Sequence, residues 1–174
     1  MLVERLLSRT VWPIAAALAS LAMLGAAHAF ERFAFLAPCP LCLRQREVYW
    51  AVIAMVVTGL ILAQLRTTPR FLNALNALIG LAFFAGAMVA GYHAGVEWGL
   101  LPAPAGCEGG GAVDLLSDDL GLGERIATES CKDAPWHFLG LSMAVWNALI
   151  SLGLAALSVV AALPSRKAPS PIPE

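Results

Sequence analysis

Four cysteines are the side chains of this 174-residue chain that are best suited to chemistry, and they form two different pairs. Cys39 and Cys42 make a C-x-x-C motif, whereas Cys107 and Cys131 lie 24 residues apart in a stretch rich in glycine and proline. Paired thiols exchange with other disulfides, because a thiolate attacks a disulfide sulfur. Four cysteines allow three connectivities, so the sequence leaves the bonding pattern open.

The C-x-x-C pair has surroundings that favour a reactive thiolate. It directly precedes a long apolar run, so we expect Cys42 at or just before the first turn of a helix, where the helix terminus carries partial positive charge. Arg44 and Arg46 follow within about one turn, and nearby cations also favour the thiolate. Two prolines restrict the backbone around Cys39. We therefore expect Cys39 to project toward water and Cys42 to face the membrane surface.

A static, purely structural disulfide is the alternative for each pair. A two-residue C-x-x-C loop constrains the unfolded chain little, so such a bond would stabilise the fold weakly. A bond between Cys107 and Cys131 would contribute about 3 kcal/mol by the chain-entropy estimate, which suits a static role. The glycines and prolines around Cys107 instead predict a mobile, exposed disulfide that an incoming thiolate can attack.

Two metal-centred alternatives also follow from the residue types. Four cysteines are a possible zinc site, but the second pair lacks the spacing of a zinc knuckle. A haem would need axial histidines on facing helices, and His28, His93 and His137 all fall near the outer ends of apolar runs. We expect no bound metal.

The composition predicts a membrane protein that positions these cysteines. The chain is 59% hydrophobic and 13% charged, whereas a soluble domain carries roughly 25% charged residues. Four apolar runs approach the length of about 20 residues that spans a bilayer, and lipid requires such spans to be helical. The runs cover residues 11–30, 48–64, 71–91 and 139–163.

The resulting fold class is all-α, a four-helix transmembrane bundle in a single membrane domain over residues 1–163. A long periplasmic loop over 92–138 connects the third and fourth helices, and residues 164–174 form a disordered cytoplasmic tail. The net charge of −1 gives no reason to expect nucleic acid as a partner.

The distribution of charges predicts the orientation of the spans. The side that holds both termini and the 65–70 connection carries six basic and two acidic residues, against five basic and ten acidic residues opposite. Basic residues close to span ends stay in the cytoplasm. We therefore expect both termini inside and all four cysteines outside, where disulfides persist. Residues 1–29 also have the pattern of a secretory signal, and its cleavage would leave the cysteines outside.

The order of these features resembles the disulfide bond formation protein B (DsbB) family. A span is followed by C-x-x-C, two more spans, a loop with two cysteines and a last span. Three segments carry the resemblance in detail: PCPLCLRQR at 38–46, GYHAGVE at 91–97 and WHFLGLSM at 136–143. Ala144 departs from the pattern, since many members carry proline there.

The resemblance implies a thiol oxidase of the bacterial inner membrane. Members reoxidise a periplasmic thioredoxin-fold dithiol oxidase (DsbA-like) and reduce ubiquinone or menaquinone. By this resemblance, Cys107 and Cys131 form the pair that the partner attacks, and Cys39 and Cys42 form the pair next to the quinone.

The resemblance also implies roles for three further residues. Arg46 matches the arginine that supports quinone reduction, and His93 and Trp136 fall where the family has residues near the quinone or the relay. Two other classes of function stay open. One is an enzyme of the vitamin K epoxide reductase type, in which the C-x-x-C motif lies at the last span. The other is a small membrane subunit with two static disulfides.

Overall fold

The computed structural model describes residues 6–65, 68–107 and 130–163. The predicted tail over 164–174, and residues 108–129 of the predicted loop, lie outside these ranges. Four long helices dominate the described chain, and each is long and apolar enough to cross a membrane. They are α2 (Trp12–Phe33), α3 (Pro40–Leu65), α4 (Pro69–Glu97) and α5 (Met143–Ala162). The all-α, four-helix class is confirmed.

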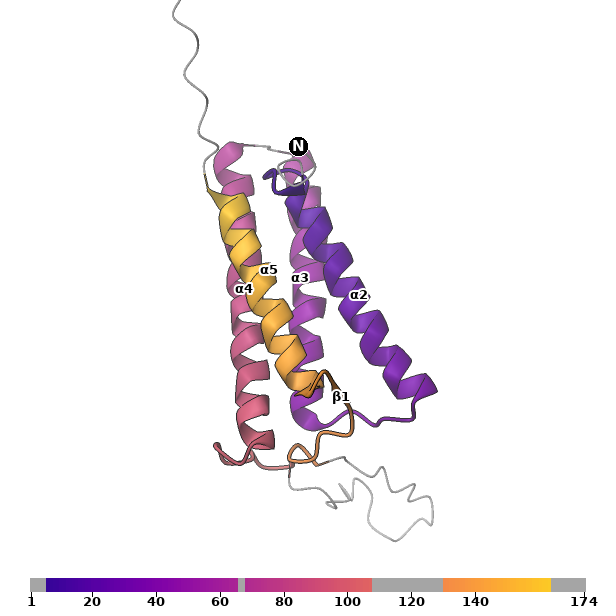
Figure 1. Ribbon diagram of the computed structural model, residues 1–174. Coiled ribbons are helices and arrows are strands. Elements are labelled where there is room, and N and C mark those ends of the chain that lie inside the picture. The colour runs from indigo at the N-terminus through magenta and orange to yellow at the C-terminus, as the bar shows by residue number, and fades with distance from the viewer. Residues whose placement is uncertain (1–5, 66–67, 108–129, 164–174) are drawn as a thin grey trace, which may run out of the picture.

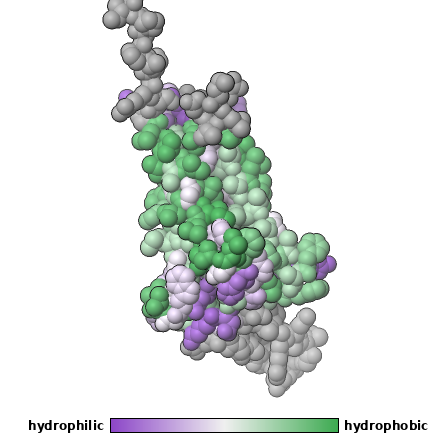
Figure 2. All heavy atoms as spheres, viewed as in Figure 1, coloured by the Kyte–Doolittle hydropathy of each residue, from purple (hydrophilic) through white to green (hydrophobic). Residues whose placement is uncertain are grey.

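The four helices lie side by side, and α2 begins at the same end of the bundle where α5 finishes (Figure 1). The opposite end carries the connection from α2 to α3 and the chain that leads into α5. Helix α4 packs most extensively against α5 and next against α3, whereas α2 packs chiefly against α3. The face of the helical body that Figure 2 shows is largely apolar, as expected of side chains that face lipid.

The helices do not begin and end with the apolar runs. Helix α3 begins at Pro40, eight residues before the run at 48–64, and α4 continues to Glu97, six residues beyond 91. Hydropathy detects the part of a helix that suits lipid, but these helix ends turn polar side chains toward the interior of the bundle. Proline is also well suited to the first helical position, because it lacks the N–H that would have no partner there.

A short hairpin replaces the expected first turn of the last helix. Strands β1 (His137–Phe138) and β2 (Leu141–Ser142) pair antiparallel, and Leu139 and Gly140 between them both have positive φ. A two-residue type I′ turn requires this backbone conformation at both positions. Ser142 then begins α5, because its side chain accepts a hydrogen bond from the Val145 N–H. The hairpin is why α5 starts at Met143 rather than at 139.

Two glycines let α4 approach its neighbours closely. A Cβ atom on Gly80 would lie 3.1 Å from the Cβ atom of Ser158 in α5, and one on Gly86 would lie 3.0 Å from a methyl group of Val48 in α3. Small residues serve this purpose in membrane bundles, where close packing holds helices together. Ser158 also accepts a 2.9 Å hydrogen bond from the Trp12 indole, which ties α2 to α5.

Candidate redox site

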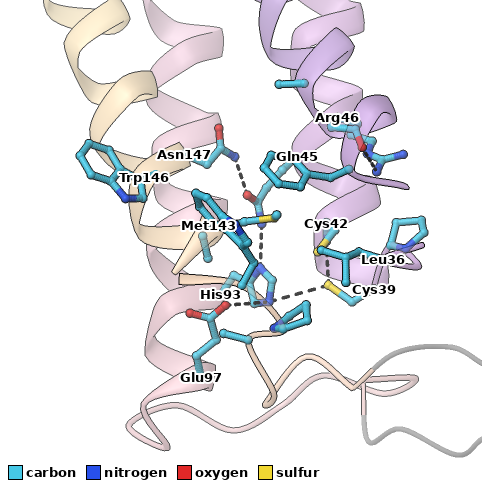
Figure 3. A pocket seen from close by; sticks show the side chains of 18 of the residues that line it. Leu36, Cys39, Cys42, Gln45, Arg46, His93, Glu97, Met143, Trp146 and Asn147 are labelled. Atoms are coloured by element: carbon cyan, nitrogen blue, oxygen red, sulfur yellow. Dashed lines mark hydrogen bonds and ion pairs between the residues drawn. The ribbon is translucent and has the colours of Figure 1, made fainter. Parts of the chain in front are cut away.

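A cavity of about 390 Å³ lies at the end of the bundle that carries the C-x-x-C motif. Its volume falls in the usual range for small-molecule sites, roughly 300–1,000 Å³. Side chains from all four helices and from the chain that precedes β1 line it (Figure 3), and most of its wall is apolar. Five of the seven residues that the sequence singled out line this cavity, namely Cys39, Cys42, Arg46, His93 and Trp136.

Cys107 and Cys131 form a disulfide, whereas Cys39 and Cys42 are free thiols. The disulfide does not line the cavity. It lies in a cluster of buried side chains that also contains Cys39, so the two cysteine pairs are neighbours in space. Of the three connectivities that the sequence left open, the bond is compatible only with the one that pairs Cys107 with Cys131 and leaves Cys39 to pair with Cys42.

The expectation that this disulfide is exposed is wrong. Both sulfur-bearing residues are 0% exposed, because Leu41 and Val96 pack against them in the same cluster. The Cys131 N–H also donates a 3.1 Å hydrogen bond to the Cys107 carbonyl oxygen. Glycine and proline favour a flexible backbone around Cys107, but they do not show that Leu41 at the start of α3 and Val96 at the end of α4 pack in the same cluster.

The expectation that Cys39 projects into water is also wrong. Cys39 is 3% exposed, while Cys42 is half-buried. Cys39 precedes Pro40 at the start of α3, and its sulfur accepts a 3.1 Å hydrogen bond from the Cys42 N–H. The sulfur therefore caps an otherwise unpaired N–H of the first helical turn.

The environment of Cys39 affects the acidity of its thiol. The hydrogen bond with the Cys42 side chain, together with burial, raises the pKa of the Cys39 thiol well above its ordinary value. The Cys39 thiol therefore gives up its proton less readily than an ordinary thiol. Cys42 is the cysteine that lies in the first turn of α3, where the helix terminus favours negative charge.

A chain of polar side chains links Cys39 to α5. His93 Nε2 lies 3.7 Å from Cys39 Sγ, and His93 Nδ1 lies 2.9 Å from the Gln45 side-chain nitrogen. The Gln45 carbonyl oxygen accepts a hydrogen bond from the Asn147 amide, and the Tyr49 hydroxyl donates to the Asn147 oxygen. Figure 3 shows this chain crossing the cavity from α3 and α4 to α5. Polar groups that share a buried network of this kind fix one another's orientation.

Sequence reasoning did not assign Gln45, Asn147 or Glu97 to the site. Glu97 Oε1 lies 3.7 Å from His93 Nε2, and the Ser142 hydroxyl donates a hydrogen bond to the same carboxylate. Two features of the sequence could have identified Glu97 and Asn147. Glu97 follows His93 by four residues, a spacing that places both on one helix face. Asn147 is a polar residue inside an apolar run, and such residues face the bundle interior in membrane proteins.

The two arginines after the C-x-x-C motif have different surroundings. The Arg46 guanidinium donates a 2.7 Å hydrogen bond to Glu31 on α2, and its side chain is 15% exposed. Arg44 is 70% exposed and pairs with Glu47 on the outer surface, a contact that contributes little to stability. Only Arg46 lines the cavity. It thus offers a fixed positive charge at the cavity wall.

Trp136 brings an aromatic ring to the cavity from the chain that precedes β1. Its ring stacks on that of Phe138 at a centroid distance of 6.0 Å and packs at an angle on Phe30 of α2 at 5.1 Å. Helix α5 holds Phe138 in place, because the Trp146 indole N–H donates a 3.0 Å hydrogen bond to the Phe138 carbonyl oxygen. The result is an aromatic wall between α2 and α5.

Comparisons with known proteins identify the family of this chain. The family model for the disulfide bond formation protein DsbB matches residues 8–161. The chain is 31% identical over 153 residues to a disulfide bond formation protein B from Dechloromonas aromatica, covering 86% of this chain and 89% of the relative. A protein of the same name from Methylococcus capsulatus is 33% identical over 145 residues, covering 80% and 85%. No solved structure matches the chain significantly. The chain therefore belongs to the DsbB family of disulfide bond formation proteins.

Proposed function

We propose that this protein is a membrane thiol:quinone oxidoreductase that reoxidises a periplasmic thioredoxin-fold dithiol oxidase of the DsbA type. Family membership supports the coarser statement, a bacterial multi-pass membrane protein of disulfide bond formation. One observation carries the finer proposal. A free C-x-x-C pair lines a largely apolar cavity and contacts, through Cys39, a cluster that contains a second, bonded pair.

Electrons would enter at the outer pair. A thiolate of the reduced partner attacks the Cys107–Cys131 disulfide, and the second partner thiol resolves the mixed disulfide. The partner leaves oxidised, and Cys107 and Cys131 become thiols. These thiols then reduce a Cys39–Cys42 disulfide by the same exchange, which gives the free thiols seen in the structure. Each exchange breaks one disulfide and forms one, so two electrons move inward at each step.

The cavity fits a quinone ring in size and in the character of its wall. A membrane quinone, ubiquinone or menaquinone, supplies there the two-electron acceptor that returns the Cys39–Cys42 dithiol to a disulfide. Trp136 offers an aromatic face to a planar ring. The positive charge of Arg46 at the cavity wall would stabilise negative charge on a bound acceptor, and pre-positioned charge of this kind is a strong catalytic effect. His93 and its polar chain hold Cys39 at the cavity. Because the Gln45 amide donates to Nδ1, Nε2 is the ring nitrogen that carries the hydrogen, and its N–H faces the Cys39 sulfur, where it can stabilise negative charge.

This function requires the cysteines to lie in the periplasm and both termini in the cytoplasm. Fusions of a reporter that is active only in the periplasm should be active after Trp98, beyond the end of α4, and inactive after Thr68, between α3 and α4. The ends of the bundle on which these residues lie are opposite in Figure 1. A cytoplasm-specific reporter at the same positions is the matched control. Active periplasmic reporter after Thr68 would reverse the orientation and reject the proposed partner.

Arg46→Ala should slow quinone reduction by about 100-fold, because it removes the positive charge at the cavity wall. Arg44→Ala should change turnover by less than about 2-fold, since exposed ion pairs contribute little. The measurement is quinone KM and turnover for purified variants with reduced dithiol as the electron source. Glu31→Gln is the control for a tether between α2 and α3. If Glu31→Gln slowed quinone reduction as much as Arg46→Ala does, Arg46 would act by joining α2 to α3, and its proposed role at the cavity would be wrong.

A further inference from the structure

The C-x-x-C pair has a third potential ligand beside it. The sulfur atoms of Cys39 and Cys42 and the Nε2 atom of His93 all lie within 4.8 Å of one another. We propose that the dithiol form of this pair, with His93, binds a thiophilic divalent cation such as Zn²⁺ or Cd²⁺, and that the bound cation holds the protein in its reduced state. Two thiolates and an imidazole are the donors that such cations prefer.

The distances are close to those of a tetrahedral site. Zinc lies about 2.3 Å from sulfur and about 2.1 Å from nitrogen, which sets neighbouring ligand atoms roughly 3.5 Å apart. Cys39 Sγ already lies 3.7 Å from His93 Nε2. Closing the widest separation in the cluster takes a shift of about 1 Å, within the reach of the half-buried Cys42 side chain.

Glu97 lies next to the histidine but outside this three-residue cluster. Its Oε1 atom lies 3.7 Å from His93 Nε2, and its side chain is 7% exposed. A dication would balance the two thiolate charges, which are costly at a buried site. Mg²⁺ and Ca²⁺ do not suit these ligands, because they require six or more oxygen donors.

The polar chain behind His93 suits metal binding as well. A histidine that ligates through Nε2 donates a hydrogen bond from Nδ1 to an acceptor, which fixes the ring. The Gln45 amide contacts Nδ1, and the Asn147 amide contacts Gln45. If the side-chain amides of Gln45 and Asn147 both flip, so that nitrogen and oxygen exchange places, Gln45 presents its carbonyl oxygen to Nδ1. The Tyr49 hydroxyl at the end of the chain can donate or accept, so every hydrogen bond is kept.

Binding would depend on the redox state of the pair. Two thiols and one dication give a dithiolate complex and two protons, with no transfer of electrons. In the disulfide form the two sulfurs are bonded to each other and are no longer thiolate ligands. The cation therefore competes with oxidation of the pair. This site differs from the four-cysteine zinc alternative, because Cys107 and Cys131 are joined in a disulfide.

A Cd²⁺ titration of the purified full-length protein in detergent tests the site. Cadmium bound to thiolate absorbs in the near ultraviolet, and the metal content is counted after dialysis. We expect one Cd²⁺ in the protein whose C-x-x-C pair is reduced and none in the oxidised protein. His93→Ala and His93→Gln should both weaken binding by at least about 10-fold. The matched control is His28→Ala, because His28 is exposed on α2 outside the cluster.

Three outcomes would overturn the proposal. Equal Cd²⁺ affinity of the wild type and both His93 variants would remove the histidine from the site. Binding to the oxidised protein would remove the thiolates. Binding without loss of quinone-coupled turnover would reject the inhibitory role. Only the inhibitory role of the cation rests on the proposed function, whereas the metal site itself does not. If no quinone supported turnover even without Cd²⁺, the proposed function would fail, and the titration would still decide the metal site.

Discussion

Cys39→Ser is expected to lower quinone-coupled turnover by at least about 1,000-fold, since a residue that completes a catalytic unit cannot be removed without losing most of the rate. Serine cannot form a disulfide with Cys42, so electrons that reach the outer pair have no route to the cavity. The fold should survive. Serine is a good N-cap and keeps the hydrogen bond from the Cys42 N–H that the Cys39 sulfur accepts at the start of α3.

The measurement combines two readouts on the purified variant. Quinone reduction with reduced dithiol partner reports the whole path, and acid trapping of mixed disulfides reports exchange at the outer pair. The first should vanish and the second should persist. Leu43→Ala is the matched control, because Leu43 is an exposed side chain on the same helical turn and does not line the cavity. Full quinone turnover in Cys39→Ser would disprove the relay from one pair to the other.

Cys131→Ser should also lower turnover by at least about 1,000-fold, but it should block a different step. Without its bonded partner, Cys107 is a lone thiol and cannot accept electrons from a reduced dithiol. In the wild type the burial of this disulfide adds a requirement, since both cysteines are 0% exposed. A partner must open the cluster around Leu41 and Val96 before a thiolate can reach either sulfur.

The Cys131→Ser experiment compares turnover with the state of the C-x-x-C pair. That pair should remain a disulfide in this variant when quinone is present, because no electrons arrive to reduce it. Lys132→Ala, at the neighbouring exposed position that does not line the cavity, is the control and should retain turnover. Loss of the disulfide also costs about 3 kcal/mol of stability, so thermal unfolding is measured alongside. A folded Cys131→Ser protein with normal turnover would rule out the outer pair as the point where electrons enter.

The four-helix architecture could be predicted from the sequence because a bilayer requires long apolar runs and a helical backbone within them. The helix starts could not. The first eight residues of α3 and the last six of α4 include polar side chains inside the bundle, such as Gln45 and His93, and exposed ones, such as Arg44. Hydropathy does not distinguish the two locations. Cys42, Arg46, His93 and Glu97 all lie in these two helix ends. The helix bounds were therefore predicted wrongly in the part of the chain that forms the site.

Residues near one another in sequence were placed more reliably than contacts across the bundle. Cys42 in the first turn of α3 follows from the chain around it. The burial of Cys39 does not, because it depends on α4, more than fifty residues away, through contacts such as that with His93. The path from His93 through Gln45 to Asn147 requires the relative rotation of three helices. No local pattern specifies that rotation.

The central claim is that dithiol oxidation and quinone reduction are two ends of one reaction in this protein. The direct measurement uses purified protein, a reduced thioredoxin-fold dithiol partner and a short-chain quinone, without oxygen. Quinone loss is followed by absorbance, and the partner disulfide is counted in the same sample. The account predicts one quinone reduced for each partner disulfide formed, at a rate that depends on the protein. Partner oxidation without quinone loss, or quinone loss without partner oxidation, would contradict it.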